Sequence, residues 1–472
     1  MQTVRILVAL LLPWAVGAIW LRALQSPARC RSILQTIAYG HLGGIVALTL
    51  IMRAATVLGL RWSFIGIDVA LGILLIAGIA VLTLRGRRST TVQPGASTID
   101  DPFAWRWLAV VASVLLGIRL ANLAWAVILQ PLYPWDAWTQ WATKAKVWSA
   151  LHSMVPFIDY SQWLARQPGY VDTAPHYPAT VPLLQAWMAL ALGNFDDALV
   201  NLPWLAICVA LAAGVHGQVR SMGGSAPWSL LVTYAVLSLP ILDTHVALAG
   251  YADLFVCATF TLGLLALVHW ERERDPMQLF QLAIAVVLLP TLKVPGIVWS
   301  ATLLLGLLVA VFGATAVRVA LVVSAASAVT GGVVFLLFRS KLASVTTDAK
   351  AELAQPITAN LFLFDNWHLL WYLLPIAVVV GWRDALRRMR GTSAALIAGF
   401  GFLWATFALT RAGNWVADYT TVNRALLHIA PAALVFSAVL VREWAVRRET
   451  ESSAPAHALS GSDPPPRAEA TQ

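Results

Sequence analysis

Charged side chains are scarce in this sequence. Only 12% of the 472 residues are Asp, Glu, Lys or Arg, against about 25% in a soluble globular chain. Hydrophobic residues make up 59%, and they recur in runs near the ~20 residues that a helix needs to cross a bilayer. The runs lack the alternation of apolar and polar positions that marks a transmembrane β-barrel. The composition excludes a soluble protein and predicts an all-α, polytopic bundle of transmembrane helices.

Cysteine and recognisable motifs are also nearly absent. The three cysteines, Cys30, Cys208 and Cys257, are odd in number, follow no metal-binding spacing, and two of them lie inside apolar runs. They therefore imply no disulfide framework. The sequence contains no P-loop, Rossmann glycine pattern, zinc motif or heptad repeat. The two halves show no repeat either, which weakens the case for an inverted-repeat transporter.

Arginine accounts for much of the net charge of +9. A basic chain invites a nucleic-acid partner, but many of these arginines stand in short links between apolar runs. Cytoplasmic loops of membrane proteins carry this excess of positive charge. We therefore predict no nucleic-acid partner and use these links to mark the cytoplasmic side: Arg85, Arg87 and Arg88; Arg383, Arg387, Arg388 and Arg390; Arg447 and Arg448.

The apolar runs divide the chain into four parts. Residues 1–84 hold three spans, the first of which is read as a retained helix rather than a signal peptide because further spans follow at once. Residues 85–104 form a cytoplasmic linker, 105–441 a transmembrane core, and 442–472 a disordered cytoplasmic tail rich in Pro and small polar residues. We count about thirteen spans, which places the N-terminus outside: 5–24, 36–58, 63–84, 105–130, 198–219, 227–242, 250–270, 277–291, 293–313, 316–338, 367–382, 392–410 and 424–441.

The longest hydrophilic region between spans, 131–176, is predicted to lie on the outer side. Trp138, Trp141, Ala145 and Trp148 recur in it at helical spacing, which is typical of a helix lying flat in the headgroup layer. The apolar segment that follows, 177–195, is short and bounded by prolines. It is read as partly re-entrant, covered by protein on the outer side.

Polar residues recur at the predicted outer ends of the spans. Charges in or beside a membrane are costly, so their convergence at one depth indicates a shared polar cavity. Two further outer loops are predicted, over 339–366 and 411–423. The clusters are Asp136 with Lys144 and Lys146; 172–177, which contains His176 and Tyr177; 243–253, which ends at Asp253; Lys293; and 411–424, which ends at Arg424.

Each candidate has a structural alternative. Asp136 is either a proton acceptor or metal ligand, or the N-cap of the helix that follows. Lys144 and Lys146 either attract a phosphate or extend to lipid headgroups. Lys293 lies between two apolar runs beside Pro295 and Gly296, where it either places a point charge in a cavity or has no functional role.

Each of the remaining candidates also has both a functional and a structural interpretation. His176 precedes Tyr177 and Pro178, and a lone histidine is more often packed or hydrogen-bonded than functional. Asp253 begins a span and either joins the cavity or caps its helix. Arg424 and His428, four residues apart, share one helix face, with Arg424 facing a phosphate or lipid headgroups.

Six short motifs occur in a familiar order. Trp135-Asp136-Ala137-Trp138 is followed by Lys144-Ala145-Lys146, then by His176-Tyr177-Pro178. Gly250-Tyr251-Ala252-Asp253 opens a later span, and Leu292-Lys293-Val294-Pro295-Gly296 and Asn423-Arg424 through His428 come last. Over residues 105–440 this arrangement resembles the C-type (GT-C) membrane glycosyltransferases that use polyprenyl-phosphate sugars. It is most similar to the protein O-mannosyltransferase, aminoarabinose-transferase and rhizobial lipopolysaccharide glycosyltransferase branch.

The resemblance implies roles for these residues. Asp136 is expected to be the catalytic base, with Lys293 and Arg424 as phosphate contacts. Lys144, Lys146, His176, Tyr177 and Asp253 would complete the substrate cavity. Many relatives carry two acids in the first outer loop, whereas Ala137 and Trp138 follow Asp136 here, so a divalent metal is possible but not required. Asp172 or Asp253 would have to supply the second carboxylate. The three spans before residue 105 have no counterpart in the resemblance.

The expected function is transfer of a sugar from a polyprenyl-phosphate donor to an envelope glycan, lipid or protein. The reaction would occur at the periplasmic or outer face of a cell inner membrane, with membrane lipids as partners. The alternative is a transporter or flippase of a lipid-linked or anionic solute, which would need the cations but no base. A non-catalytic scaffold of envelope assembly is a third option. The sugar, the acceptor and the oligomeric state are not specified by the sequence.

Overall fold

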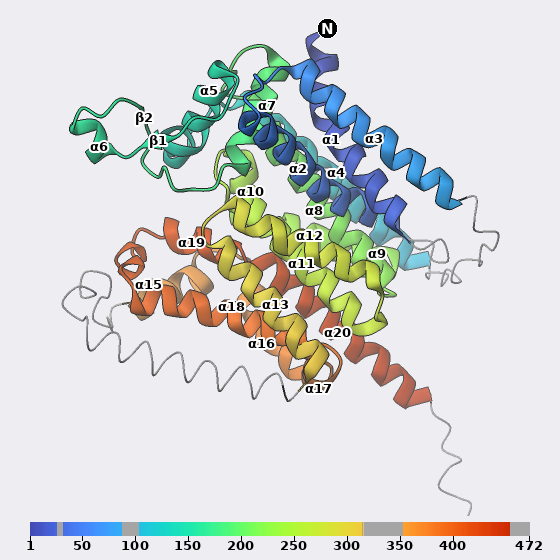
Figure 1. The fold of residues 1–472 in the computed structure, drawn as a ribbon. Helices are drawn as coiled ribbons and strands as arrows, with labels where there is room; N and C mark the ends of the chain where they lie inside the picture. Colours follow the sequence, from blue (N-terminus) through green and yellow to red (C-terminus); the bar gives the residue numbers. More distant parts are fainter. Residues whose placement is uncertain (26–31, 87–102, 314, 316–352, 454–472) are drawn as a thin grey trace, which may run out of the picture.

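The computed structural model describes residues 1–25, 32–86, 103–313, 315 and 353–453 (Figure 1). Within these ranges the chain is almost entirely helical, and one parallel pair of two-residue strands is present, with Phe157 opposite Tyr170. The predicted all-α class is confirmed. The predicted span over 316–338, most of the linker and the predicted loop from residue 339 to 352 lie outside the described residues.

Four long helices begin the chain. Gly17 lets the first two pack backbone to backbone, because a Cβ atom there would lie 1.9 Å from the carbonyl oxygen of Gly40. Small residues bring membrane helices together in this way. The four helices are α1 (Gln2–Leu24), α2 (Ile33–Val57), α3 (Phe64–Gly86) and α4 (Phe103–Leu129).

The segment after α4 forms a lobe that projects from one end of the bundle (Figure 1). Its elements are η1 (Ala137–Trp141, a π-helix), α5 (Ala142–Leu151), β1 (Phe157–Ile158), α6 (Tyr160–Leu164), β2 (Tyr170–Val171) and α7 (Thr180–Leu192). Every residue of α7 is buried. Its 13 residues span about 20 Å, which is shorter than the ~30 Å hydrocarbon core of a membrane.

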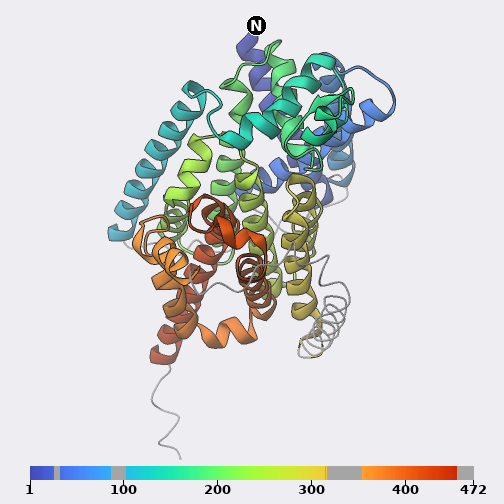
Figure 2. The same ribbon diagram turned by 90° about the vertical axis from the view of Figure 1, so that its left-hand side faces the viewer.

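The centre of the bundle is α11, whose apolar stretch is completely buried. It lies among helices from both halves of the chain, as Figures 1 and 2 show from two directions. The central elements are η2 (Leu199–Asn201), α8 (Leu202–Ser221), α9 (Ala226–Leu237), α10 (Pro240–Ala247), α11 (Asp253–Glu273), α12 (Pro276–Leu292) and α13 (Gly296–Phe312).

The C-terminal part closes the bundle around α11. Its elements are α15 (Ala354–Thr358), η4 (Ala359–Leu363, a π-helix), α16 (Leu370–Val380), α17 (Trp382–Arg387), α18 (Arg390–Leu409), η5 (Arg411–Trp415), α19 (Thr420–Leu427) and α20 (Ala430–Ser453). The last helix continues to Ser453, so the prediction that disorder begins at residue 442 is wrong for 442–453. Ion pairs from Glu443 to Arg272 (2.9 Å) and Arg388 (3.3 Å) hold this extension against neighbouring segments.

Seven described helices are long and apolar enough to cross a membrane, or nine if two bent helix pairs each count as one span. The bent pairs are α9 with α10 and α19 with α20. Helices α3 and α4 leave large apolar side chains exposed, such as Ile65 (74%) and Trp125 (69%). Such surfaces suit lipid rather than water. A membrane protein is therefore supported, whereas the predicted count of thirteen spans is not confirmed, because α12, α13 and α16, which fall on three of those spans, have only 11 to 17 residues.

Hydrogen bonds between buried amides join the N-terminal helices to the core. Gln35 of α2 donates to Gln218 of α8 (3.1 Å), and Gln218 donates to Tyr39 (2.8 Å) and Gln278 (2.9 Å). The ring of His269 also bonds to Gln218 (2.7 Å). These bonds tie α2 to the core, and α1 and α3 pack against α2 and α7, so the three helices that lack a counterpart in the resemblance belong to one bundle with the core.

The tryptophan stripe of the first outer loop faces protein rather than headgroups. Trp141, Ala145 and Trp148 are buried against the rest of the lobe, while Trp138 is 48% exposed. The expected interfacial helix is corrected on this point, because α5 packs on α7 and the apolar stripe is the packing face.

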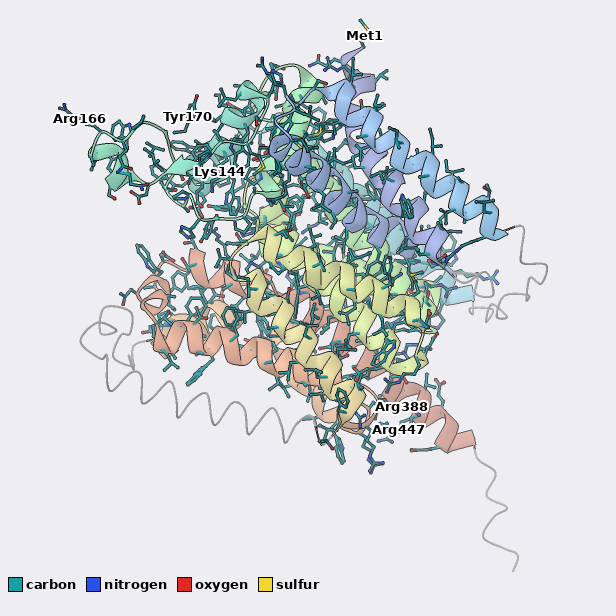
Figure 3. The ribbon with its side chains drawn as sticks, in the orientation of Figure 1. Met1, Lys144, Arg166, Tyr170, Arg388 and Arg447 are labelled. Carbon is teal, nitrogen blue, oxygen red and sulfur yellow. The ribbon has the colours of Figure 1, made fainter. Side chains whose placement is uncertain are left out.

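The lobe and the arginine-rich links occupy opposite ends of the molecule. Figure 3 places Lys144, Arg166 and Tyr170 at one end and Arg388 and Arg447 at the other. We call these the lobe end and the arginine end. The separation agrees with the sidedness that the arginines predict.

Candidate active site

Asp253 is the buried centre of a charged cluster at the lobe end. It is the first residue of α11, and its side chain is fully buried. Its Oδ1 atom accepts hydrogen bonds from Lys293 Nζ (2.6 Å) and His428 Nε2 (2.8 Å), and its Oδ2 atom accepts one from Arg424 Nε (3.1 Å). Three donors from two other parts of the chain, the turn after α12 and the helix α19 with its end, therefore use this carboxylate.

A proline-shaped turn delivers Lys293. The residue ends α12 in an extended conformation (φ −157°, ψ 151°), and Pro295 directly precedes α13. Pro290 interrupts α12 because it has no N–H to give to the carbonyl of Val286, four residues earlier. The hydroxyl of Ser300 on α13 donates to that carbonyl instead (2.8 Å). The two helices are thus tied together just beneath the turn that carries the ammonium.

Helix α19 delivers Arg424, and His428 follows at its end. Their spacing of four residues puts both on one face. The indole N–H of Trp299 bonds to His428 Nδ1 (3.0 Å). An indole only donates, so Nδ1 carries no proton. His428 is therefore neutral and donates its Nε2 proton to Asp253.

Arg424 connects the buried acid to the partly exposed one. Its Nη1 atom lies 2.6 Å from Asp136 Oδ2, and the side chains of Arg424 and Asp136 are 20% and 24% exposed. The guanidinium also lies over the ring of Tyr251, 4.2 Å from its centre. Asp136 precedes η1 but its side chain makes no cap bond, so its contact with Arg424 takes the place of the expected capping role.

Gly250 allows the loop before α11 to come close to the loop that carries Asp136. Its φ of +131° is in a region that favours glycine. A Cβ atom at this position would lie 2.3 Å from the Cβ atom of Ala137. Glycine in Gly250-Tyr251-Ala252-Asp253 thus lets the chain before α11 touch the residue that follows Asp136.

The cluster is electrically balanced. Two carboxylates, Asp136 and Asp253, face two cations, Lys293 and Arg424, and His428 is neutral. The two acids differ in how many further hydrogen bonds they can accept, because Asp253 has three donors whereas Asp136 forms an ion pair with Arg424 alone among the described residues. Asp136 is the carboxylate with oxygen lone pairs left for a substrate.

Two tyrosines border the cluster. Burial raises the pKa of both phenols, and the carboxylates of Asp253 and Asp136 push the pKa of each in the same direction, while Arg424 opposes them. Tyr177 also stacks on Trp141, with ring centres 5.4 Å apart. Both phenols therefore keep their protons at neutral pH and remain hydrogen-bond donors.

The other predicted substrate contacts have different surroundings. Lys144 is buried in an ion pair with Asp172 (3.2 Å) and donates to the carbonyl of Ala174 (2.8 Å). Burial lowers the pKa of Lys144, and Asp172 opposes that shift. Lys146 is exposed, with Nζ 5.6 Å from the ring centre of Phe195. His176 is exposed beside the ring of Tyr177. Thus Asp136, Asp253, Lys293 and Arg424 are brought together directly, Tyr177 borders them, and Lys144, Lys146 and His176 do not join their ion pairs.

The donor set does not match a divalent metal site. No group of three or more His, Cys, Asp or Glu side chains that could hold an ion occurs in the part of the chain that the structure describes. Arg424 already joins the two acids that a metal would need. Asp172, the other candidate second acid, is paired with Lys144.

Four neighbours of the cluster were absent from the predicted site. Two of them could have been found from the sequence. His428 follows Arg424 by four residues and so shares its helix face, and Tyr251 lies within the motif that ends at Asp253. No sequence pattern indicates Trp299 or His245 as a neighbour of the cluster. The ring of His245 is buried beside Tyr251 and interacts electrostatically with Asp253, Arg424 and Lys293. Its Nδ1 bonds to the carbonyl of Ile241 (2.8 Å), whereas its buried Nε2 has no partner among the described residues.

Comparison with known proteins gives no family for this chain. No family model, no curated protein and no solved structure matches it. The geometry of the charged cluster is therefore the main basis for a functional assignment.

Proposed function

We propose that this protein is a membrane glycosyltransferase that uses a polyprenyl-phosphate sugar. The observation that carries the proposal is the pairing of Asp136 with Arg424, backed by Asp253, at the lobe end of a membrane bundle. A base for an acceptor hydroxyl and a cation for a departing phosphate are the two groups that this reaction needs.

The chemistry balances with the groups present. The acceptor oxygen forms a bond to the anomeric carbon of the sugar, and the bond from that carbon to the phosphate oxygen breaks. The bonding electrons leave with the polyprenyl phosphate, whose charge becomes more negative by one. The proton of the acceptor hydroxyl passes to Asp136, whose carboxylate becomes neutral.

Arg424 is the proposed phosphate contact. Its Nε and Nη1 atoms hold the two acids, while its Nη2 atom is used in neither of these ion pairs. Because the phosphate gains charge during transfer, a fixed cation stabilises the transition state more than the bound donor. Lys293, buried behind Asp253, adds positive charge and fixes the orientation of that acid.

The surroundings of α19 suit a lipid-linked donor. Val422 and Leu426 of this helix line an apolar cavity of about 380 Å³ together with residues of α15, η4 and α18. An apolar cavity beside the helix that carries Arg424 is compatible with a substrate that has a hydrocarbon chain and a phosphate. The proposed location is the inner membrane with the site on the periplasmic side, and the proposed acceptor is an envelope glycan, lipid or protein.

The direct test is Asp136→Asn, which removes the proton acceptor and keeps the shape of the side chain. Transfer from polyprenyl-phosphate sugars by the purified full chain should fall by at least about a hundredfold, the lower end of the contribution of general base catalysis. Asp159→Asn is the matched control, because Asp159 is an exposed N-cap in the same lobe and Asn can also cap. Full turnover by Asp136→Asn, with normal folding, would remove Asp136 from the mechanism.

A transporter of a lipid-linked or anionic solute is the second candidate. The buried amides of Gln218, Gln278 and Gln281 favour it, since they place polar groups in the same bundle far along α11 from Asp253. Proteoliposomes that move a polyprenyl-phosphate sugar across the bilayer without forming a glycosylated product would support transport over transfer.

A further inference from the structure

We infer that Arg424 keeps Asp136 from acting as a base until a donor phosphate displaces it, so that the donor must bind before the acceptor is activated. This inference rests on the proposed function and concerns the regulation of the same site. It predicts a competition between a carboxylate of the protein and a phosphate of the substrate for one guanidinium.

The free protein shows the blocked arrangement. Asp136 Oδ2 lies 2.6 Å from Arg424 Nη1, a distance typical of a strong charge-assisted contact. The guanidinium occupies the position beside Oδ2 that the hydroxyl of an acceptor would need. Asp136 therefore has to leave Arg424 before it can take a proton efficiently.

Arg424 is held so that it can change one partner and keep the others. Its Nε atom stays on Asp253, which Lys293 and His428 hold in place, and its flat face lies on Tyr251. The Nη1 and Nη2 edge is the part of the guanidinium that is not used by the buried acid. This edge has the geometry to bind two oxygens of a phosphate side by side.

Asp136 is free to move when it is displaced. It makes no cap bond, it precedes a π-helical turn, and a quarter of its side chain is exposed. Single π-helical turns are frequent at functional sites. A phosphate on Arg424 would thus leave the carboxylate uncovered beside the anomeric carbon, where the acceptor arrives. Without a donor, water meets no free base.

The test is a double-mutant cycle on phosphate binding, with a polyprenyl monophosphate that carries no sugar as the probe. The full chain is placed in nanodiscs, and the dissociation constant is measured by thermal stabilisation or calorimetry. Asp136→Asn should bind the probe about tenfold more tightly than the unaltered protein, since the competitor is weakened. In the Arg424→Gln background the same Asp136→Asn change should alter binding by less than about twofold, because no guanidinium remains to compete for.

The cycle separates competition from repulsion. Equal tightening with and without the Arg424→Gln change would mean that Asp136 merely repels the phosphate. No tightening by Asp136→Asn in the protein that keeps Arg424 would mean that the carboxylate and the phosphate do not compete. Either result overturns the inference and leaves the proposed function standing. If Arg424→Gln fails to fold, Arg424→Lys replaces it and should reduce the tightening. Failure of the unaltered protein and of Asp136→Asn to bind the probe overturns the proposed function as well.

Discussion

At the scale of single residues, the surroundings of two aspartates determine what each can do. Asp253 is fully buried and uses both oxygens for Lys293, His428 and Arg424. Asp136 is partly exposed and pairs with Arg424 alone among the ion pairs of the described residues. A saturated carboxylate fixes the positions of cations, whereas a carboxylate with free lone pairs can accept a proton. The same residue type therefore serves as a support in one place and as the candidate base in the other.

Removing the charge of Asp253 should destabilise the protein. In Asp253→Asn the ammonium of Lys293 stays buried without an anionic partner, and breaking a buried pair in this way costs about 3–5 kcal/mol. The midpoint of thermal unfolding in detergent should fall accordingly. Adding Lys293→Met to Asp253→Asn should recover part of the loss. A double variant that is no more stable than Asp253→Asn would show that the pair is not coupled.

His245 should contribute to substrate affinity through its unpaired Nε2 atom. A buried acceptor without a partner is suited to a substrate hydroxyl, and loss of one such bond costs about 0.5–1.5 kcal/mol. His245→Phe should therefore raise KM by roughly three- to tenfold with the fold intact. His245→Gln, which offers a carbonyl oxygen near the position of Nε2, should restore part of the affinity. Equal KM values for both variants would exclude this role.

At the scale of elements, α5 in the lobe packs against protein, although the sequence predicts a helix on the membrane surface. Helix α5 packs on the fully buried α7, and its Lys144 reaches the carbonyl of Ala174 next to Asp172. The backbone that leads to Tyr177 is thereby fixed. Lys144 supports the border of the cluster from behind, in place of the phosphate contact that the sequence indicated.

The protein should keep its stability only when Lys144 and Asp172 are replaced together. Lys144→Met leaves Asp172 buried without its cation and should lower stability by about 3–5 kcal/mol. The double variant Lys144→Met, Asp172→Asn removes both charges and keeps an acceptor for the backbone of Ala174, so most of that stability should return. Chemical unfolding in mild detergent measures both. A double variant as unstable as the single one would contradict the assignment.

At the scale of the whole molecule, charge is divided between the two ends. The lobe end carries the charged cluster, and the arginine end carries Arg388 and Arg447 (Figure 3). Acidic partners such as Glu443 and Asp384 bind several of these arginines. A bundle inserted according to the positive-inside rule would present its site to the outer compartment.

This sidedness can be measured with single cysteines. In a chain with Cys30 replaced by serine, Tyr170→Cys should react with a membrane-impermeant maleimide in intact spheroplasts, and Arg388→Cys should react only after lysis. Both positions are exposed, and Cys208 and Cys257 are buried, so the background should be low. The reverse labelling pattern would place the site in the cytoplasm.

The sequence by itself determined the membrane class, the helical architecture and the positions of most helices. Long apolar runs leave a chain few other structures, because backbone groups in lipid must be satisfied within a helix. It also pointed to Asp136, Asp253, Lys293 and Arg424, since charges beside apolar runs are rare enough to stand out.

Only the tertiary structure decided which of these residues meet. Arg424 and Asp136 are far apart in the chain, and so are Lys293 and Asp253, so their contacts depend on how the helices pack around α11 and on the close approach at Gly250. Short motifs are compatible with many arrangements of neighbouring helices, which is why Lys144 turned out to support the lobe and why His245 and Trp299 gave no signal. Local pattern fixes which segments become helices, because that choice depends on neighbouring residues, whereas the pairing of distant charges depends on packing that no single segment contains.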